Sequence, residues 1–188
     1  SRGLGDVYKR QLLGGTMGAE SHEQRLQAFK DVIATYPDIE VVDEQRDDDS
    51  VEKAISLTES WLQAYPDLGG ILCNNMSNPV GACQAVTDAD KAGDIIIGGM
   101  DHDLRSLNYL KDGTLYVAQV QNCYDMGYKL IWNAVKTIDG ETVDEVTDVG
   151  STSVYADDAD NYITMLYGED ADTCLLYTSP SPRDPKTS

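Results

Sequence analysis

The sequence predicts an α/β fold, a doubly wound parallel sheet with helices on both faces. Short apolar runs alternate five times with longer segments in which apolar residues recur every three or four positions. Strand alternating with helix is typical of a parallel sheet that is covered on both sides. An internal repeat supports this prediction, because Tyr36-Pro37-Asp38-Ile39 returns as Tyr65-Pro66-Asp67-Leu68 after 29 residues. That spacing is about one strand-plus-helix unit, with proline ending each helix.

The first four elements follow from local patterns. Residues 12–15 are a short apolar stretch that ends in glycines, which predicts the first strand. Residues 20–36 place apolar side chains at helical spacing, and residues 39–43 are a β-branched run that predicts the second strand. Residues 50–65 form the second predicted helix, with one continuous apolar stripe and with an acid or serine at its start as the N-terminal cap.

The later elements continue the alternation. Residues 71–73 predict a strand, and the helix after it opens at Pro79, since proline is accepted in a first helical turn. Residues 94–98 contain three consecutive isoleucines, a run typical of a strand that is buried on both faces. The remaining predicted elements are a short helix at 104–110, a strand at 114–119 and a helix at 124–138, whose apolar stripe is Tyr124, Tyr128, Ile131, Val135 and Ile138.

Both ends of the chain are predicted to lie outside this fold. Residues 1–11 and 174–188 show no hydrophobic period, and the second of these segments holds Pro180, Pro182 and Pro185. Both segments resemble translated adapter sequence, and a natural disordered tail is the alternative. We therefore expect both to be non-native and the true N-terminus to lie elsewhere, so the lack of a signal-peptide pattern after residue 1 carries no weight.

The composition argues against several classes of protein. The chain carries 33 acidic and 14 basic residues, for a net charge of −19, and such a surface repels nucleic acid and anionic lipid. No apolar run approaches the roughly 20 residues of a membrane span. No cysteine or histidine spacing suits zinc, and the cysteines inside the predicted fold stand in apolar surroundings, which predicts buried free thiols. We expect no metal and no cofactor.

No catalytic set is recognisable in the sequence. The only histidines are His22 and His102, and no serine or cysteine stands in a nucleophile-elbow setting. The glycines that follow the first strand do not have the dinucleotide-binding spacing. The run Asp47-Asp48-Asp49 lacks the glycine and distal glutamate of a calcium loop, and we predict a solvated helix entry there instead. The protein is therefore not expected to be an enzyme.

Polar residues gather in the loops that follow the predicted strands. In a parallel sheet these loops share one edge, and ligands bind there. The loops carry amides and carboxylates, which hydrogen-bond hydroxyl groups, and they span residues 15–23, 74–79, 99–103 and 119–122. Each residue alone has a structural alternative: an asparagine or serine before Pro79 can cap the helix there, and Asp101 can cap the next helix. Taken together, four polar loops at one edge predict a ligand site.

Four stretches, taken in order along residues 12–162, carry a family resemblance. They are Arg25-Leu-Gln-Ala-Phe29; Gly70-Ile-Leu-Cys-Asn-Asn75 with Gly81-Ala82 after it; Ile97-Gly-Gly-Met-Asp101; and Asp112-Gly-Thr-Leu through Gln121 to Met126-Gly127-Tyr128. In this order the chain resembles the sugar-binding branch of the type I periplasmic (solute) binding proteins, close in pattern to ribose-binding proteins. The resemblance implies two similar α/β lobes, joined by crossing strands, with a sugar closed between them.

The resemblance also implies a division of the chain. Residues 12–120 resemble the C-terminal, second lobe, and residues 121–173 resemble the crossover helix and a returning segment. The opening half of the first lobe is expected to be missing, so that only half of a cleft is encoded here.

Carried over by position, Asn75, Asp101 and Gln121 match places where the family hydrogen-bonds sugar hydroxyls. Asn75 would donate and accept, Asp101 would accept two hydroxyl protons, and Gln121 would lie where the lobes hinge. Two residues depart from the family pattern. Glu23 stands where a sugar-clamping arginine is common, and Met76 stands where an aspartate often follows the asparagine. A carboxylate in place of a guanidinium reverses the charge offered to the ligand, so an amino sugar or another cationic ligand becomes an alternative to a neutral sugar.

The function that the resemblance implies is that of a non-enzymatic receptor, which captures a sugar for an ABC importer. Its partners would be the sugar and the membrane permease of the importer, and its location would be periplasmic or otherwise extracytoplasmic. The alternative is the effector-binding domain of a lactose-repressor-type transcription regulator, which has a related fold and is less expected from so acidic a chain. The upstream reading frame separates the two, since a receptor has a leader peptide and a regulator has a helix-turn-helix.

Overall fold

The computed structural model describes residues 8–169 and 171. Within these residues, strands and helices alternate along the chain from β1 to α5, as the sequence predicts. The strands are β1 (Tyr8–Gly14), β2 (Ile39–Arg46), β3 (Gly70–Cys73), β4 (Ile96–Met100), β5 (Val117–Gln121) and β6 (Ser151–Val154). The helices are α1 (Glu20–Ile33), α2 (Val51–Ala64), α3 (Ser77–Asp88), α4 (Leu104–Asp112), α5 (Cys123–Ile138) and α6 (Ala156–Tyr167).

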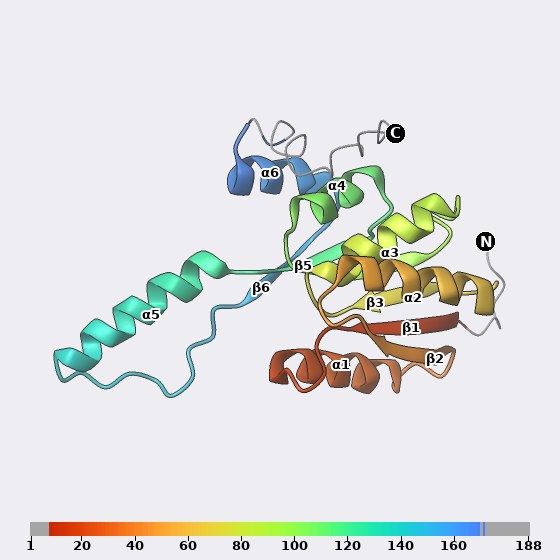
Figure 1. Cartoon of the computed structure of the whole chain (residues 1–188). Helices are drawn as coiled ribbons and strands as arrows, with labels where there is room; N and C mark the ends of the chain where they lie inside the picture. Colours follow the sequence, from red (N-terminus) through yellow and green to blue (C-terminus); the bar gives the residue numbers. More distant parts are fainter. Residues whose placement is uncertain (1–7, 170, 172–188) are drawn as a thin grey trace, which may run out of the picture.

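The strands form one sheet in the order β2-β1-β3-β4-β5-β6. The first five pair in parallel, and β6 pairs antiparallel with β5. α1 lies on one face of the sheet, and α2, α3, α4 and α6 lie on the other (Figure 1). The predicted α/β class, with a mainly parallel sheet and helices on both faces, is confirmed. The antiparallel edge strand is not predicted by the sequence, because three of its four residues are exposed and no apolar pattern marks it.

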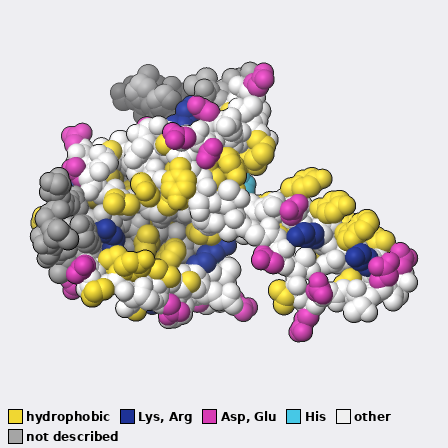
Figure 2. All heavy atoms as spheres, turned by 180° about the vertical axis from the view of Figure 1, so that it is seen from behind, with side chains coloured by type: hydrophobic (Ala, Val, Ile, Leu, Met, Phe, Trp, Pro, Cys, Tyr) yellow, Lys and Arg dark blue, Asp and Glu magenta, His cyan; other side chains and the backbone are white. Residues whose placement is uncertain are grey.

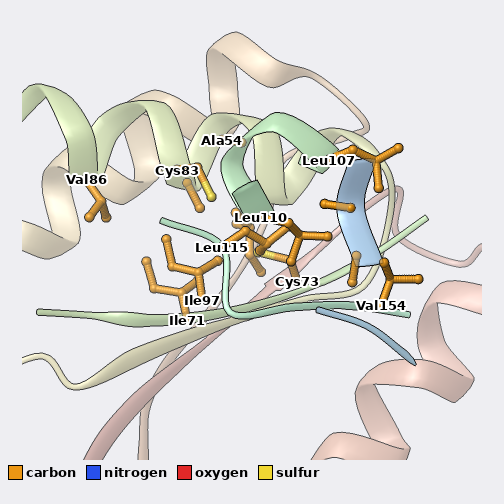
Figure 3. Close-up of a cluster of buried hydrophobic side chains, with 14 of the residues drawn as sticks. Ala54, Ile71, Cys73, Cys83, Val86, Ile97, Leu107, Leu110, Leu115 and Val154 are labelled. Carbon is orange, nitrogen blue, oxygen red and sulfur yellow. The ribbon is translucent and has the colours of Figure 1, made fainter. Parts of the chain in front are cut away.

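The main hydrophobic core lies between the sheet and the helices α2, α3, α4 and α6. Ile71 on β3 and Ile97 on β4 are fully buried, and Figure 3 shows their side chains facing Cys83 of α3. Each such aliphatic side chain contributes about 1.5–3 kcal/mol by leaving water. The thiols of Cys73 and Cys83 are free and buried, as predicted, and burial raises the pKa of both. Cys123 is free but exposed, so the predicted burial is wrong for this thiol, because it lies on the projecting helix α5.

β1 begins earlier than the sequence predicts. Residues 8–11, expected to lie outside the fold, form its first half and pair with β2. Arg10 and Gln11 also pair with β3, and Gln11 is fully buried. The exclusion of residues 1–11 from the fold is therefore wrong for these four, because backbone pairing to two neighbouring strands does not require an apolar pattern. Residues 1–7 and the expected tail at 174–188 lie outside the described residues.

The helix starts follow local capping chemistry. Ser50 caps α2, in line with the predicted cap, and its hydroxyl oxygen accepts the N–H of Lys53 at 3.2 Å. α3 begins at Ser77, two residues before Pro79, so proline occupies the first turn, where its missing N–H has no intrahelical partner to lose. α4 is capped by Asp103 and not by Asp101.

α5 projects from the body of the protein (Figure 1), and none of its residues is buried. Tyr124, Ile131 and Ile138, from the predicted apolar stripe, are 79%, 65% and 84% exposed. Figure 2 shows the hydrophobic side chains in a row along this projecting arm. An apolar helix face of this extent normally packs against a partner. Among the helices of residues 8–169 and 171, none combines the length and hydrophobicity needed to cross a bilayer.

Candidate functional site

The loops that follow β1, β2, β3 and β4 meet at one edge of the sheet, together with the end of β5. α5 leaves the body from this edge, because it starts directly after β5 (Figure 1). Parallel sheets bind ligands at the carboxyl ends of their strands. The polar side chains here form two hydrogen-bonded groups. One group joins the loops after β1, β2 and β3, and the other joins the loop after β4 to the end of β5.

Asp101 and Gln121, two of the predicted ligand residues, form the second group. The side-chain amide of Gln121 donates a hydrogen bond to the carboxylate of Asp101. The backbone N–H of Asp101 donates to the carbonyl of Gln119 at 2.9 Å, and Asp101 has a φ of 67°. That left-handed backbone is tolerated best by glycine, asparagine and aspartate. Both side chains are partly exposed, so the pair keeps hydrogen-bonding positions for hydroxyl groups of a ligand.

Asn75, the third predicted ligand residue, belongs to the first group and is only 4% exposed. Its Oδ1 accepts the backbone N–H of Asn78 at 2.8 Å and the hydroxyl of Ser77 at 3.1 Å. Its Nδ2 donates to the carboxylate of Asp49 and lies 3.5 Å from Oδ1 of Asp47. The capping role that the sequence leaves open for this asparagine is therefore present at the start of α3. Both ends of the amide are engaged, and one of them orients Asp49.

Asp47 anchors the first group from inside the protein. The residue is fully buried, and its carboxylate accepts hydrogen bonds from the Asn78 side-chain amide, from the Ser77 hydroxyl at 3.3 Å and from the N–H of Asp49 at 2.9 Å. Burial raises the pKa of the Asp47 carboxyl, and these hydrogen bonds oppose the rise. The prediction that residues 47–49 form a solvated helix entry is thus wrong for Asp47, because packing against the start of α3 removes it from water.

Asp49 is the carboxylate that the first group presents at the rim. Its side chain is 46% exposed, and it accepts a hydrogen bond from the hydroxyl of Thr16 at 2.5 Å as well as from Asn75. Nδ1 of His22 lies 4.0 Å from its Oδ1. Asp49 and the preceding Asp48 have φ values of 61° and 54°, so two successive residues hold a strained backbone at the loop tip. Asp49 is not among the predicted ligand residues, and its place in the loop between β2 and α2 is the signal in the sequence that could have found it.

Glu23, the fourth predicted ligand residue, lies at the start of α1 and is already paired. Its Oε2 lies 2.9 Å from Nη2 of Arg46, and its Oε1 accepts the backbone N–H of Gly18 at 3.2 Å. Arg46 also pairs with Glu44 at 2.8 Å, and its side chain is 16% exposed. The negative charge that the sequence predicts at this position is therefore offset within a cluster in which Arg46 and Lys30 balance Glu23 and Glu44.

A cavity of about 530 Å³ opens beside Gln121. It lies between the loop after β4, the start of α5 and α6, and its lining includes His102, Tyr124 and Tyr162. The other three predicted ligand residues are not in the lining of this cavity. Among residues 8–169 and 171, no group of three His, Cys, Asp or Glu side chains is placed to hold a metal ion.

The chain is similar to known binding proteins in sequence and in structure. Two curated relatives are a xylitol-binding protein of Mycolicibacterium smegmatis, 28% identical over 120 residues, and a D-ribose/D-allose-binding protein of Pseudomonas aeruginosa, 27% identical over 137 residues. The matches cover 63% and 73% of this chain but only 34% and 43% of the relatives. The chain therefore spans less than half the length of these two proteins.

A solved structure shows the same likeness in three dimensions. An ABC transporter periplasmic solute binding protein from Actinobacillus succinogenes, with bound D-allose, superposes with a TM-score of 0.78 at 28% identity, over 84% of this chain and 56% of that one. A family model described as periplasmic binding protein domain matches residues 3–142, a span that begins inside the segment that the sequence led us to exclude. With this match over most of its length, the chain belongs to the periplasmic binding protein domain family.

Proposed function

We propose that this chain is part of a sugar-binding protein that captures its ligand for an ABC importer. The observation that carries the proposal is the likeness to a solute-binding protein with D-allose bound, at a TM-score of 0.78. The relatives named above bind xylitol, D-ribose or D-allose according to their names. The edge of the sheet offers carboxylates and amides, which suit a ligand rich in hydroxyl groups. The comparisons lend no support to the repressor-type alternative.

In this proposal Asp101 and Gln121 contact the sugar directly. Asp101 accepts hydroxyl protons, and Gln121 donates and accepts beside the point where α5 leaves the body. Asn75 contributes mainly by orienting Asp49 at the rim, and Glu23 lies at the outer end of the same edge. Because Arg46 offsets the charge of Glu23, a neutral sugar is favoured over an amino sugar.

The chain would supply the second lobe of the protein, which with the first half of β1 included is residues 8–120, followed by the crossover helix and returning segment at 121–173. α5 would then pack its exposed apolar side chains on the first lobe. Trp132 on α5 is 52% exposed, whereas Trp61 of α2 is 3% exposed. When the first lobe is supplied, the Trp132 emission should move to shorter wavelength and lose its quenching by acrylamide, while the Trp61 emission stays unchanged. Unaltered quenching of Trp132 would contradict this assignment.

The proposed partners are the sugar and the membrane permease of the importer, and the proposed location is periplasmic or otherwise extracytoplasmic. Nucleic-acid binding and membrane insertion are not part of the proposal. The upstream reading frame tests the location: a signal or lipoprotein leader supports it, and a helix-turn-helix contradicts it.

Calorimetry with two forms of the protein tests the function. One form is this chain, and the other is a two-lobed version that includes the upstream lobe. We expect D-allose or D-ribose to bind the two-lobed version at micromolar concentration, because closure between lobes desolvates the ligand. The isolated chain should bind weakly or undetectably. Micromolar binding by the isolated chain, or no binding of any pentose or hexose by the two-lobed version, would contradict the proposal.

A further inference from the structure

Asn74, which lies next to a predicted ligand residue but faces away from solvent, joins two loops of the candidate site. The residue is fully buried. Its Oδ1 accepts the backbone N–H of Gly15 at 3.0 Å, and its Nδ2 donates to the carbonyl of His22 at 2.8 Å. One side chain thus joins the first residue after β1 to the first turn of α1. Its backbone carbonyl accepts a further hydrogen bond from Nη1 of Arg25 at 3.0 Å.

The three loops after β1, β2 and β3 meet over Gly15, where no side chain fits. A Cβ built on Gly15 would lie 2.4 Å from Nδ2 of Asn75, 2.5 Å from Oδ1 of Asp49 and 2.6 Å from Nδ1 of His22. Side chains from the first turn of α1, the loop after β2 and the loop after β3 therefore converge on one backbone position. Among the residues that the structure describes, Asn74 is the only hydrogen-bond partner of the Gly15 N–H. Loss of that partner would leave a buried donor unsatisfied, which costs about 1–3 kcal/mol.

We propose that Asn74 is a positioning residue of the candidate sugar site. By holding Gly15, it fixes the position of the loop after β1, so that the side chains of Asn75 and Asp49 can hydrogen-bond to each other over Gly15. This part of the site is then formed before any ligand binds. The second group of the site, Asp101 with Gln121, does not depend on it. The inference rests on the proposed function for its link to sugar, but the positioning itself is measurable without sugar.

Amide hydrogen exchange and NMR on this chain test the positioning. In the unchanged chain the Gly15 amide should be protected as strongly as the amides of β1. In Asn74→Ala its protection should fall about tenfold or more, with little change at Ile97 in β4. The side-chain amide resonance of Asn75 should also shift. Asn108→Ala is the matched control, because the Asn108 amide donates to the carbonyl of Leu104 at 3.0 Å within α4, away from the site.

A second variant approaches the same contact from the other side. Gly15→Ala inserts the Cβ that has no room, and it should shift the same Asn75 resonance in a folded protein. A Gly15 amide that exchanges freely in the unchanged chain would overturn the proposal. So would an Asn74→Ala variant that loses protection evenly across the sheet, since that result would show only a contribution to global stability.

Titration of the two-lobed version with D-allose provides the functional arm. Asn74→Ala should weaken binding about tenfold, the factor that corresponds to losing about 1.4 kcal/mol, and Asn108→Ala should leave it unchanged. Equal affinity in the two variants would overturn the positioning role. If the exchange results are as expected but the unchanged two-lobed version binds no sugar, the loop contact stands and the proposed function fails.

Discussion

The side-chain amide of Gln121 donates a hydrogen bond to the carboxylate of Asp101, and this pair is the part of the candidate site that lies nearest to α5. Asp101 follows β4 and Gln121 ends β5, so the bond couples two neighbouring strands at their carboxyl ends. A movement of α5 relative to the sheet would displace Gln121 and so change this hydrogen bond, because only one residue separates Gln121 from the helix. The loops after β1, β2 and β3 are braced separately.

Asp101→Asn tests the charge at this pair while keeping a residue that tolerates the φ of 67°. In the two-lobed version we expect sugar binding to weaken by about 1.5–3 kcal/mol, the scale for hydrogen bonds to a charged group. Thermal stability should change little. Asp103→Ala is the control: it removes the cap of α4, so it should cost about 1 kcal/mol of folding stability and leave affinity intact. Calorimetry measures the sugar affinity of both variants, and melting curves measure their stability. Unchanged affinity in Asp101→Asn would show that this residue does not belong to the site.

Glu23→Arg would place a second guanidinium beside Arg46, whose side chain is 16% exposed. We expect the free energy of unfolding to fall by more than about 1 kcal/mol, since a like-charge contact replaces an ion pair. The control Glu23→Gln removes the pair without adding a charge and should cost less. Urea unfolding at low and high salt measures both, and added salt should narrow the gap between the variants by screening the repulsion. Equal stabilities at low salt would show that the Glu23–Arg46 pair does not hold α1 to β2.

The buried carboxyl of Asp47 predicts a pH-dependent contribution to stability. Its pKa is raised above the ordinary value of 3.8, with burial as the main cause. A group whose pKa rises on folding holds its proton more tightly in the folded state, so the stability that it contributes is fully present below the unfolded pKa and is lost as the pH rises through the folded pKa. The natural chain should therefore gain stability relative to Asp47→Asn as the pH falls toward 3.8.

Urea unfolding of both proteins between about pH 3 and pH 7 measures this difference, in which the other titrating groups cancel. Asp48→Asn is a matched control, because it removes one carboxylate from the same run at a side chain that is 60% exposed. A difference between the natural chain and Asp47→Asn that stays constant with pH would contradict the prediction.

The start of the folded region can be tested by truncation. A chain that begins at Leu12 lacks residues 8–11, which pair with β2, and among which Gln11 is fully buried. Compared with a chain that begins at Tyr8, it should lose at least about 2 kcal/mol of unfolding free energy, because several backbone hydrogen bonds at about 1 kcal/mol each are removed. Urea denaturation of the two chains gives the answer. Equal unfolding free energies would show that residues 8–11 do not contribute to the fold and that it begins at residue 12.

Local patterns in the sequence were sufficient for most of the fold. The proline after each of the first two helices and the serine before α2 act within a few residues, and α1 and α2 lie where the pattern places them. The isoleucine run marks β4, but the strand is Ile96–Met100 and not residues 94–98. The predicted burial on both faces is wrong for Ile96, which is exposed. β6 was not predicted because three of its four residues are exposed and show no alternation of apolar and polar residues. The first half of β1 was not predicted because Arg10 and Gln11 are polar. Backbone pairing with β2 on one side and β3 on the other holds them in the sheet.

By itself, the sequence determined the class of fold and the edge at which polar loops gather, because strand and helix periods are local and parallel strands must end together. Only the tertiary structure decided what each polar side chain does at that edge. Asn74 bonds to His22 across 52 residues, and Glu23 pairs with Arg46 across 23 residues. Such contacts depend on how β1, β2 and β3 lie beside one another, and no local period reports that. For the same reason two aspartates of one run differ in exposure: Asp47 is buried against the start of α3, and Asp49 is partly exposed at the edge of the sheet.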